Sequence, residues 1–222
     1  METTYIEIDS PDKHLSDVLE EIPSNVILYK TLTGIGATYS EIKAQRHSII
    51  IEPNVPVIIG KCNSDKHKND NLLGVYEGVT TDRIIKYLGA SRGKYYKILT
   101  TPESFTKVKD AFLIFNGKIY NTCFLLIDEA HKTIKDVDYR SDIVLPMNDF
   151  FKFKGKALVS ATPLKFSDPR FEENGFSIIK IEPTYDYAKE IDIKPSTNIL
   201  REVWEEFGWM PFITGQGKDN PY

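Results

Sequence analysis

The sequence predicts an α/β protein in which a mostly parallel sheet carries helices on both faces. Apolar runs that suit strands alternate along the chain with segments that suit helices, an order typical of βαβ units. Several runs are apolar throughout, without the alternation of a half-exposed strand, and this favours strands buried on both faces. The expected strands are residues 26–30, 48–52, 96–100, 124–127, 157–159 and 178–181.

The segments between these runs predict the helices. The expected helices are residues 38–46, 80–88, 103–115 and 197–207. Residues 1–21 are polar and acidic, with a short helical signal that Pro23 ends. A further short apolar run lies at 57–59, and a highly polar loop follows at 61–71. No internal repeat interrupts this order.

The length of the chain indicates one main domain, and its composition indicates a surface with an ordinary content of charged residues. The chain has 222 residues, of which 41% are hydrophobic and 27% charged, with a net charge of −4. This length suits one α/β domain at 1–182, followed at 183–222 by a connector and the start of an incomplete second domain. Because there is no basic excess, any contact with nucleic acid must be local. Without a signal peptide or a membrane-length apolar run, we expect a cytoplasmic protein with no membrane partner.

A glycine turn lies between the strand at 26–30 and the helix at 38–46. It reads Thr33-Gly34-Ile35-Gly36-Ala37-Thr38. Strand, glycine turn and helix are the parts of a P-loop, in which backbone N–H groups approach phosphates at a helix start. The lysine of a P-loop is missing, because an alanine occupies its place.

Another lysine could replace the missing charge at Ala37. Lys43 is a poor candidate, because it lies about 9 Å along the expected helix and points elsewhere. Lys30 ends the preceding strand, so its long side chain could reach over the glycine turn. The alternative for Lys30 is a strand-end lysine whose head group simply reaches solvent.

Two further segments carry polar groups directly after apolar strands. Asp128 and Glu129 follow the strand at 124–127, at the edge of a parallel sheet where ligands bind. The first acid can hold Mg²⁺ and the second can deprotonate an attacking water. An acidic pair alone is more often a solvated strand end or a helix cap, but the longer sequence Asp-Glu-Ala-His is far more specific. The second segment is Ser160-Ala161-Thr162, which follows the strand at 157–159.

Over residues 24–182 these segments, in this order, resemble superfamily 2 helicases and translocases of the DEAD/DEAH type. The glycine turn resembles an atypical motif I, Asp128 to His131 is identical to motif II, and Ser160 to Thr162 is identical to motif III. Weaker matches are Glu52-Pro53-Asn54, which lies where motif Ia falls, and Thr100-Thr101-Pro102-Glu103, which resembles motif Ib.

The resemblance implies a first RecA-like P-loop NTPase domain with ATP and Mg²⁺ as cofactors. Thr38 and Asp128 would hold the metal, and Glu129 would be the general base. The residues implied at the phosphates are Thr33, Gly34, Ile35, Gly36, Ala37 and Thr38. Those that would link nucleotide state to nucleic-acid binding are His131, which also belongs to the catalytic group, and Ser160, Ala161 and Thr162. Those that would contact nucleic acid are Thr100, Thr101, Pro102 and Asn54.

Two functions remain open. The first is an ATP-dependent enzyme that acts on nucleic acid, single-stranded or duplex with DNA favoured. Because only 60 residues follow Thr162, we expect a truncated motor or one that needs a protein partner supplying a second motor domain. The second is an inactive pseudo-ATPase that binds nucleic acid or protein. Ala37 favours the pseudo-ATPase. Thr38, Asp128 and Glu129 argue against it, because an inactive site has no need for them. A nuclease or methyltransferase with a chance match is remote, and a phage or mobile element is the suggested origin.

A pair of tyrosines near basic residues offers another possible contact with nucleic acid. Tyr95 and Tyr96 lie close to Arg92, Lys94 and Lys97. Aromatic rings interleaved with cations can stack bases and hold a strand. The alternative is a core-facing tyrosine beside a solvated basic loop.

Overall fold

The structure is a computed structural model that describes residues 1–32, 34–135, 145–162 and 168–186. Thr33 of the glycine turn lies outside the described residues. So does most of the expected connector and second-domain segment at 183–222. The description below concerns the compact unit Met1–Tyr187.

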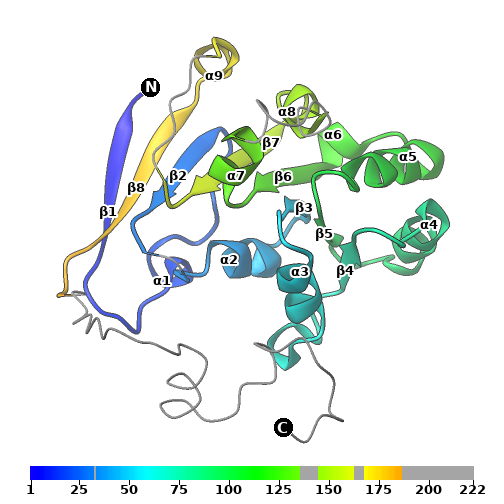
Figure 1. Cartoon of the computed structure of the whole chain (residues 1–222), viewed down its shortest axis with the longest axis horizontal. Coiled ribbons are helices and arrows are strands. Elements are labelled where there is room, and N and C mark those ends of the chain that lie inside the picture. Colours follow the sequence, from blue (N-terminus) through cyan, green and yellow to red (C-terminus); the bar gives the residue numbers. More distant parts are fainter. Residues whose placement is uncertain (33, 136–144, 163–167, 187–222) are drawn as a thin grey trace, which may run out of the picture. The chain divides into compact units, whose positions relative to one another are not determined.

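An eight-stranded sheet forms the centre of this unit, in the order β1-β8-β2-β7-β6-β3-β5-β4 (Figure 1). Every neighbouring pair of described strands is parallel, which confirms the predicted sheet. The strands are β1 Thr3–Ile8, β2 Val26–Lys30, β3 His47–Ile51, β4 Leu72–Val75, β5 Lys97–Thr100, β6 Cys123–Ile127, β7 Gly155–Ser160 and β8 Ser177–Pro183.

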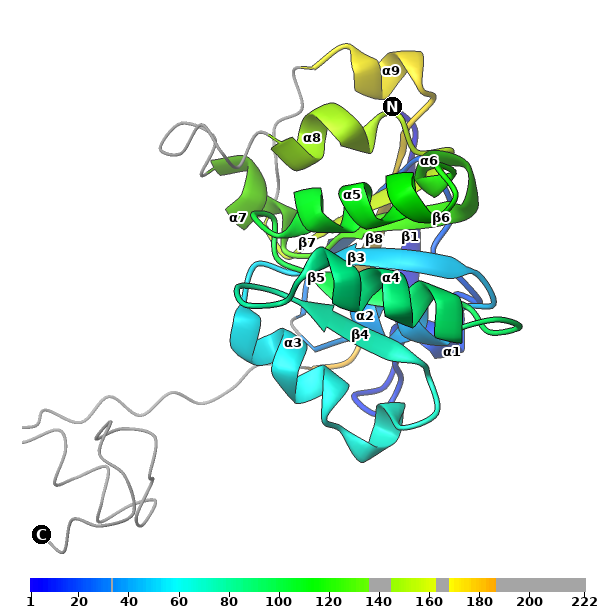
Figure 2. The ribbon, with the colours of Figure 1, turned by 90° about the vertical axis from the view of Figure 1, so that its right-hand side faces the viewer.

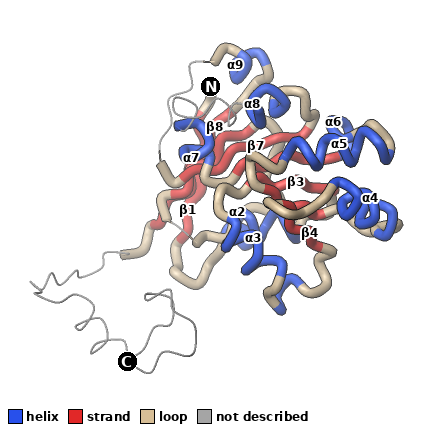
Figure 3. Tube along the Cα trace, turned by 45° about the vertical axis from the view of Figure 1, so that its right-hand side comes forward, coloured by secondary structure: helices blue, strands red, loops and turns tan. Residues whose placement is uncertain are grey.

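Helices cover both faces of the sheet, as predicted (Figures 2 and 3). One core receives side chains from α4, α5, α8 and α9, and the other receives them from α1, α2 and α3. The helices are α1 Leu15–Val18, α2 Ala37–Lys43, α3 Val55–Cys62, α4 Thr81–Ala90, α5 Phe105–Phe115, α6 Ile119–Thr122, α7 Ala130–Lys135, α8 Leu145–Phe150 and α9 Arg170–Glu173, with a 3₁₀ turn at Asp65–His67. No helix in the described ranges is long and apolar enough to cross a membrane.

The continuous apolar runs fill both cores. In β3, Ile49 and Ile51 face one core and Ile50 faces the other, and none of the three is exposed. Burying a side chain of this size contributes about 1.5–3 kcal/mol. A run with no polar side is therefore required here, because water meets neither face of the strand.

The short helices α6 to α9 were not anticipated, nor were β1, β4 and α3. β1 is an edge strand with mostly exposed residues, so it lacks a continuous apolar run. β4 is short and contains Gly74, where an added Cβ would lie 2.9 Å from a side-chain carbon of Ile58. The apolar run at 57–59 belongs to helix α3, whose first turn contains Pro56 in a position where proline is tolerated.

The parallel arrangement brings the carboxyl ends of the strands to one edge of the sheet. The hydrogen-bonded ladder continues past the strands, because the Asp128 N–H donates to the Ile51 carbonyl at 3.0 Å. In the same way the Glu52 N–H donates to the Thr100 carbonyl at 2.9 Å. Asp128 and Glu52 are therefore held on neighbouring strands at this edge.

Candidate functional site

A cleft of about 360 Å³ lies at this edge. Its size is within the range of small-molecule sites. It brings together the glycine turn, the acids after β6 and residues of the segment from 52 to 61. The lining residues are Lys30, Gly34, Gly36, Ala37, Thr38, Tyr39, Glu52, Asn54, Val57, Lys61, Asp128, Glu129 and Lys132.

The turn between β2 and α2 depends on its glycines. Gly34 has φ of 81° and Gly36 has φ of 88°, values in the left-handed region that other residues avoid. An added Cβ on Gly34 would have no heavy atom within 4 Å, so the backbone there is open to an approaching group. The Ile35 carbonyl between them accepts from the Leu15 N–H at 2.8 Å, which ties the turn to α1.

A direct hydrogen bond joins this turn to the acids. The Thr38 hydroxyl, in the first turn of α2, donates to Oδ2 of Asp128. Both residues are buried, at 5% and 4% exposure. A hydroxyl oxygen beside a carboxylate is the kind of oxygen pair that binds Mg²⁺. The structure thus brings together the two residues predicted to hold the metal.

Lys30 enters the cleft from the end of β2 and contacts both acids. Its Nζ lies 3.1 Å from Oδ1 of Asp128 and 2.8 Å from Oε1 of Glu129. Burial opposes the charged ammonium, but the two carboxylates outweigh it, so the pKa of Lys30 is raised. Burial likewise disfavours the charged Asp128, but Lys30 and the Thr38 hydroxyl hold its pKa below the ordinary value. The predicted lysine therefore lies in the cleft and is paired with the acids.

Glu129 has a strained backbone. Its φ of 49° places it in the left-handed region, which costs about 1–3 kcal/mol for a residue other than glycine. Its N–H donates to Oδ1 of Asp128 at 2.9 Å. Its other carboxylate oxygen lies 3.4 Å from Nδ1 of His131. The strained conformation thus keeps this side chain at the cleft between Lys30 and His131.

His131 also links the two acids to the segment after β7. Its Nδ1 lies 3.2 Å from Oγ of Ser160. That hydroxyl donates to the Thr162 carbonyl at 2.7 Å, and the Thr162 N–H is 3.1 Å from the same oxygen. Ala161 faces a separate hollow with Lys30 and Lys180. Of the predicted coupling residues, Ser160 thus contacts His131, and Thr162 is joined to this pair through Ser160.

The predicted nucleic-acid residues are distributed differently. Thr100, Thr101 and Pro102 are buried, and the exposed residue of this turn is Glu103. Asn54 lies in the cleft, next to the expected nucleotide site.

The tyrosine pair is divided between solvent and the protein. Tyr96 stacks on His47 with ring centroids 4.2 Å apart, and Tyr95 is 42% exposed. Of the nearby cations, Lys97 is buried.

No protein-family model matches the chain, and no protein with a curated description matches it. Among solved structures, the DEAD-box helicase Mss116 bound to ssRNA and UDP-BeF superposes with a TM-score of 0.50 at 13% identity, over 82% of this chain and 48% of that one. The chain has a RecA-like α/β fold. Its all-parallel sheet and covering helices agree with this assignment.

Two other solved structures are similar to this chain over most of its described length. A hypothetical ATP-dependent RNA helicase from Sulfolobus tokodaii aligns at 16% identity and a TM-score of 0.48, over 71% of this chain and 48% of that one. A DEAD box protein from Methanococcus jannaschii aligns at 19% identity and a TM-score of 0.46, over 71% and 45%. The chain spans about half the length of each of these structures.

The cleft of the RecA-like domain also holds residues that were not among the predicted site residues. Glu52, at the end of β3, is 3% exposed, and burial together with the charge of Asp128 raises its pKa, against the opposing charge of Lys61. Lys61 Nζ lies 3.4 Å from Oε2 of Glu52. Lys132 lines the cleft from α7. Glu52 could have been predicted, because it directly follows a strand. Lys61 could not, because its place at the cleft depends on helix α3.

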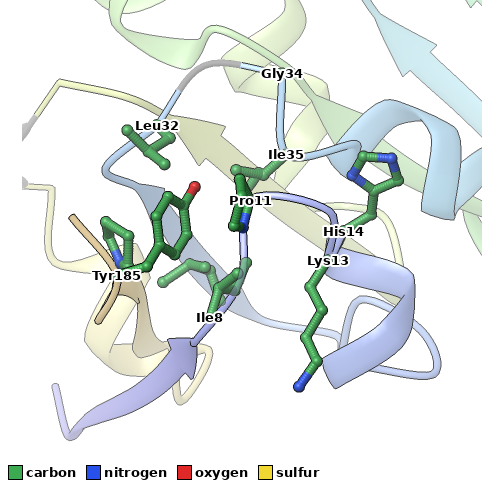
Figure 4. A pocket seen from close by; sticks show the side chains of 10 residues that line it. Ile8, Pro11, Lys13, His14, Leu32, Gly34, Ile35 and Tyr185 are labelled. Atoms are coloured by element: carbon green, nitrogen blue, oxygen red, sulfur yellow. The ribbon is translucent and has the colours of Figure 1, made fainter. Parts of the chain in front are cut away.

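A smaller hollow borders the glycine turn of the RecA-like domain. Figure 4 shows Tyr185 beside Leu32 and Pro11 there. It encloses about 90 Å³ and shares Gly34 with the main cleft. The hollow therefore extends the surface near the turn toward the segments that flank β1 and β8.

Proposed function

We propose that this chain is an ATP-binding domain of a DEAD/DEAH-type helicase, and that it hydrolyses ATP with Mg²⁺. The observation that carries the proposal is the hydrogen bond from Thr38 to Asp128 beside Glu129. It joins a glycine turn to a pair of acids in one cleft. A purely structural strand end has no need for all three groups together.

The residues present fit a magnesium-bound nucleotide. Gly34 and Gly36 leave the turn free of side chains, and the oxygens of Thr38 and Asp128 suit a hard cation. When bound, the metal and nucleotide supply a polyphosphate whose terminal phosphoryl group water can attack. Residues 34–38 would bind the phosphates, together with Thr33, and Thr38 and Asp128 would hold the metal.

The remaining residues of the cleft have distinct roles in this proposal. Glu129 accepts the proton of the attacking water. Lys30 belongs to the cofactor-binding group, where its contacts with both carboxylates hold Asp128 and Glu129 in place. His131 relays the state of the site to Ser160, which it contacts at 3.2 Å. Ala161 and Thr162 continue this link.

We propose a nucleic-acid strand as the partner, with DNA favoured. The Mss116 structure holds ssRNA, so the sugar is a question for experiment. The proposed contacts are Asn54 and the turn of Thr100, Thr101 and Pro102, whose side chains are buried in the described structure. Strand separation would require a second motor domain, which a partner protein could supply.

A pseudo-ATPase is the second candidate, and a specific observation favours it. Ala37 stands in place of the phosphate-binding lysine, and Lys30 pairs at 2.8 Å with the acid that should take a proton. In this case the domain binds nucleotide, nucleic acid or protein without turnover.

Calorimetric titration with MgATP, repeated with single-stranded DNA and with RNA, tests the proposal. We expect saturable MgATP binding and slow hydrolysis. Glu129→Gln should preserve binding and reduce hydrolysis about 10²- to 10⁴-fold, the usual contribution of a general base. Undetectable nucleotide binding would overturn the proposal, and binding with no hydrolysis in the unmodified protein would select the pseudo-ATPase.

A further inference from the structure

The cleft needs a cation that can contact phosphate, and Ala37 does not provide one. Three lysines line the cleft among the described residues: Lys30, Lys61 and Lys132. They differ in burial and in the contacts they already make. These differences decide which ammonium can turn to a nucleotide.

Lys30 is already matched in charge. Its side chain is 7% exposed, and it has two carboxylate contacts, at 3.1 Å and 2.8 Å. Turning toward a phosphate would leave Asp128 and Glu129 without this partner. Removing one member of a buried ion pair costs several kcal/mol.

Lys61 is held much more loosely. It is near the end of α3, its side chain is 25% exposed, and the structure gives its ammonium one carboxylate contact at 3.4 Å. Charge-assisted hydrogen bonds are normally 2.7–2.9 Å long. The ammonium thus lies at the cleft with most of its hydrogen-bonding capacity still available.

Glu52 explains why Lys61 stays at the cleft. Its side chain is 4% exposed, and its backbone N–H is fixed to β5 through the Thr100 carbonyl. A buried carboxylate at a fixed strand end attracts the lysine inward, where a free surface lysine would extend into water. The contact therefore orients the ammonium toward the interior of the cleft.

We propose that Lys61 binds the terminal phosphates of a nucleotide in this cleft and that Glu52 is its positioning residue. The inference rests on the proposed nucleotide-binding function. It assigns to α3 the charge that other P-loops take from the glycine turn. Lys132, which is exposed on α7, is the competing cation.

Nucleotide binding by the full chain separates these cases. We expect Lys61→Met to weaken MgATP binding about ten- to hundred-fold, the range of one charged hydrogen bond. AMP, which lacks the terminal phosphates, should bind Lys61→Met and the unmodified protein within about two-fold. Lys61→Arg should retain most MgATP affinity, and Lys68→Met, which removes an exposed lysine outside the cleft, should change nothing.

A double variant controls for damage to the fold. Lys61→Met alone leaves the Glu52 carboxylate buried, so its thermal midpoint is measured beside that of Glu52→Gln/Lys61→Met. Restored stability without restored MgATP affinity supports the inference. Restoration of both overturns it, as does a larger loss in Lys132→Met than in Lys61→Met. If the unmodified protein binds no nucleotide, the proposed function itself fails. Normal binding that Lys61→Met leaves unchanged refutes this inference alone.

Discussion

The cluster of charges at the amino ends of β3 and β5 differs from the cluster at the carboxyl ends of β2 and β6. In the first, Lys97 Nζ donates to the carbonyls of Glu41 and Ala44, at 2.7 Å and 2.8 Å, and to Oγ of Ser48 at 3.0 Å. These three bonds use all the donors of an ammonium group. The Glu41 carboxylate in turn receives Arg46 at 2.5 Å and 3.0 Å.

The carboxyl-edge cluster lies beside open space. Asp128 and Lys30 are nearly as buried as Lys97 in the first cluster. The side chains of Glu129 and Lys61, however, are 21% and 25% exposed, at a cleft of about 360 Å³. Buried charge therefore has two uses in one sheet. Where every donor is used, the charge has no capacity left for a ligand, and where capacity remains at a cleft, it can bind one.

The largest expected effect comes from breaking the cluster around Lys97 and Glu41. Glu41→Gln removes a fully buried carboxylate that Arg46 needs as a partner. We expect the free energy of unfolding to fall by about 3–5 kcal/mol, as for other broken buried ion pairs. Urea denaturation measures it. Ser40→Ala is the matched control, because the described structure gives its buried hydroxyl no hydrogen-bond partner, so stability should change little. A loss below about 1 kcal/mol in Glu41→Gln would refute the comparison.

A pH series probes the same cluster through Lys97. Burial lowers the pKa of Lys97 to about 8, from the ordinary value of 10.5, and the charge of Glu41 offsets only part of this. Between these values the unfolded chain binds more protons, so stability relative to Lys97→Met should rise with pH. The full gain is about 3 kcal/mol. Chemical denaturation at pH 8, 9 and 10 measures it, and a flat or falling difference would contradict the assignment.

The smallest expected effect concerns the cluster at the cleft. Ala37→Lys adds an ammonium at the cleft, where we expect about ten-fold tighter MgATP binding, equivalent to about 1.4 kcal/mol. Ala37→Met controls for side-chain size without charge. Calorimetry gives both dissociation constants. Equal affinities in the two variants would show that charge at this position has no effect. They would contradict the view that the cluster at the cleft can bind a ligand.

The sequence predicted those elements whose burial is complete. β6 is apolar at every position and β3 from Ile49 to Ile51, because both faces are covered there, and that pattern is visible without a structure. β1 escaped prediction because, at the sheet edge, its residues are mostly exposed. The run at 57–59 is too short for its apolar pattern to distinguish a strand from a helix. In the structure it belongs to helix α3, which packs against β4.

The same limits apply to the site. Asp128 and Glu129 were found because they follow a buried strand directly. The position of Lys30 at the end of β2 indicated that its side chain could reach the glycine turn, but the direction of its ammonium depends on Glu129 and on Asp128, which is 98 residues away in sequence. Lys61 had no signal, because its approach to Glu52 requires a helix that the sequence did not predict.

β8 also has a consequence for the order of assembly during synthesis. It lies between β1 and β2, although it is the last described strand to leave the ribosome. Until it is made, β1 has no neighbour in the sheet, and β2, which leads into the glycine turn, has one unpaired edge. Such edges invite pairing with other chains, and distant pairings form slowly. The first described strand is thus secured only after β8 has been made, and until then an unfinished edge lies beside the site.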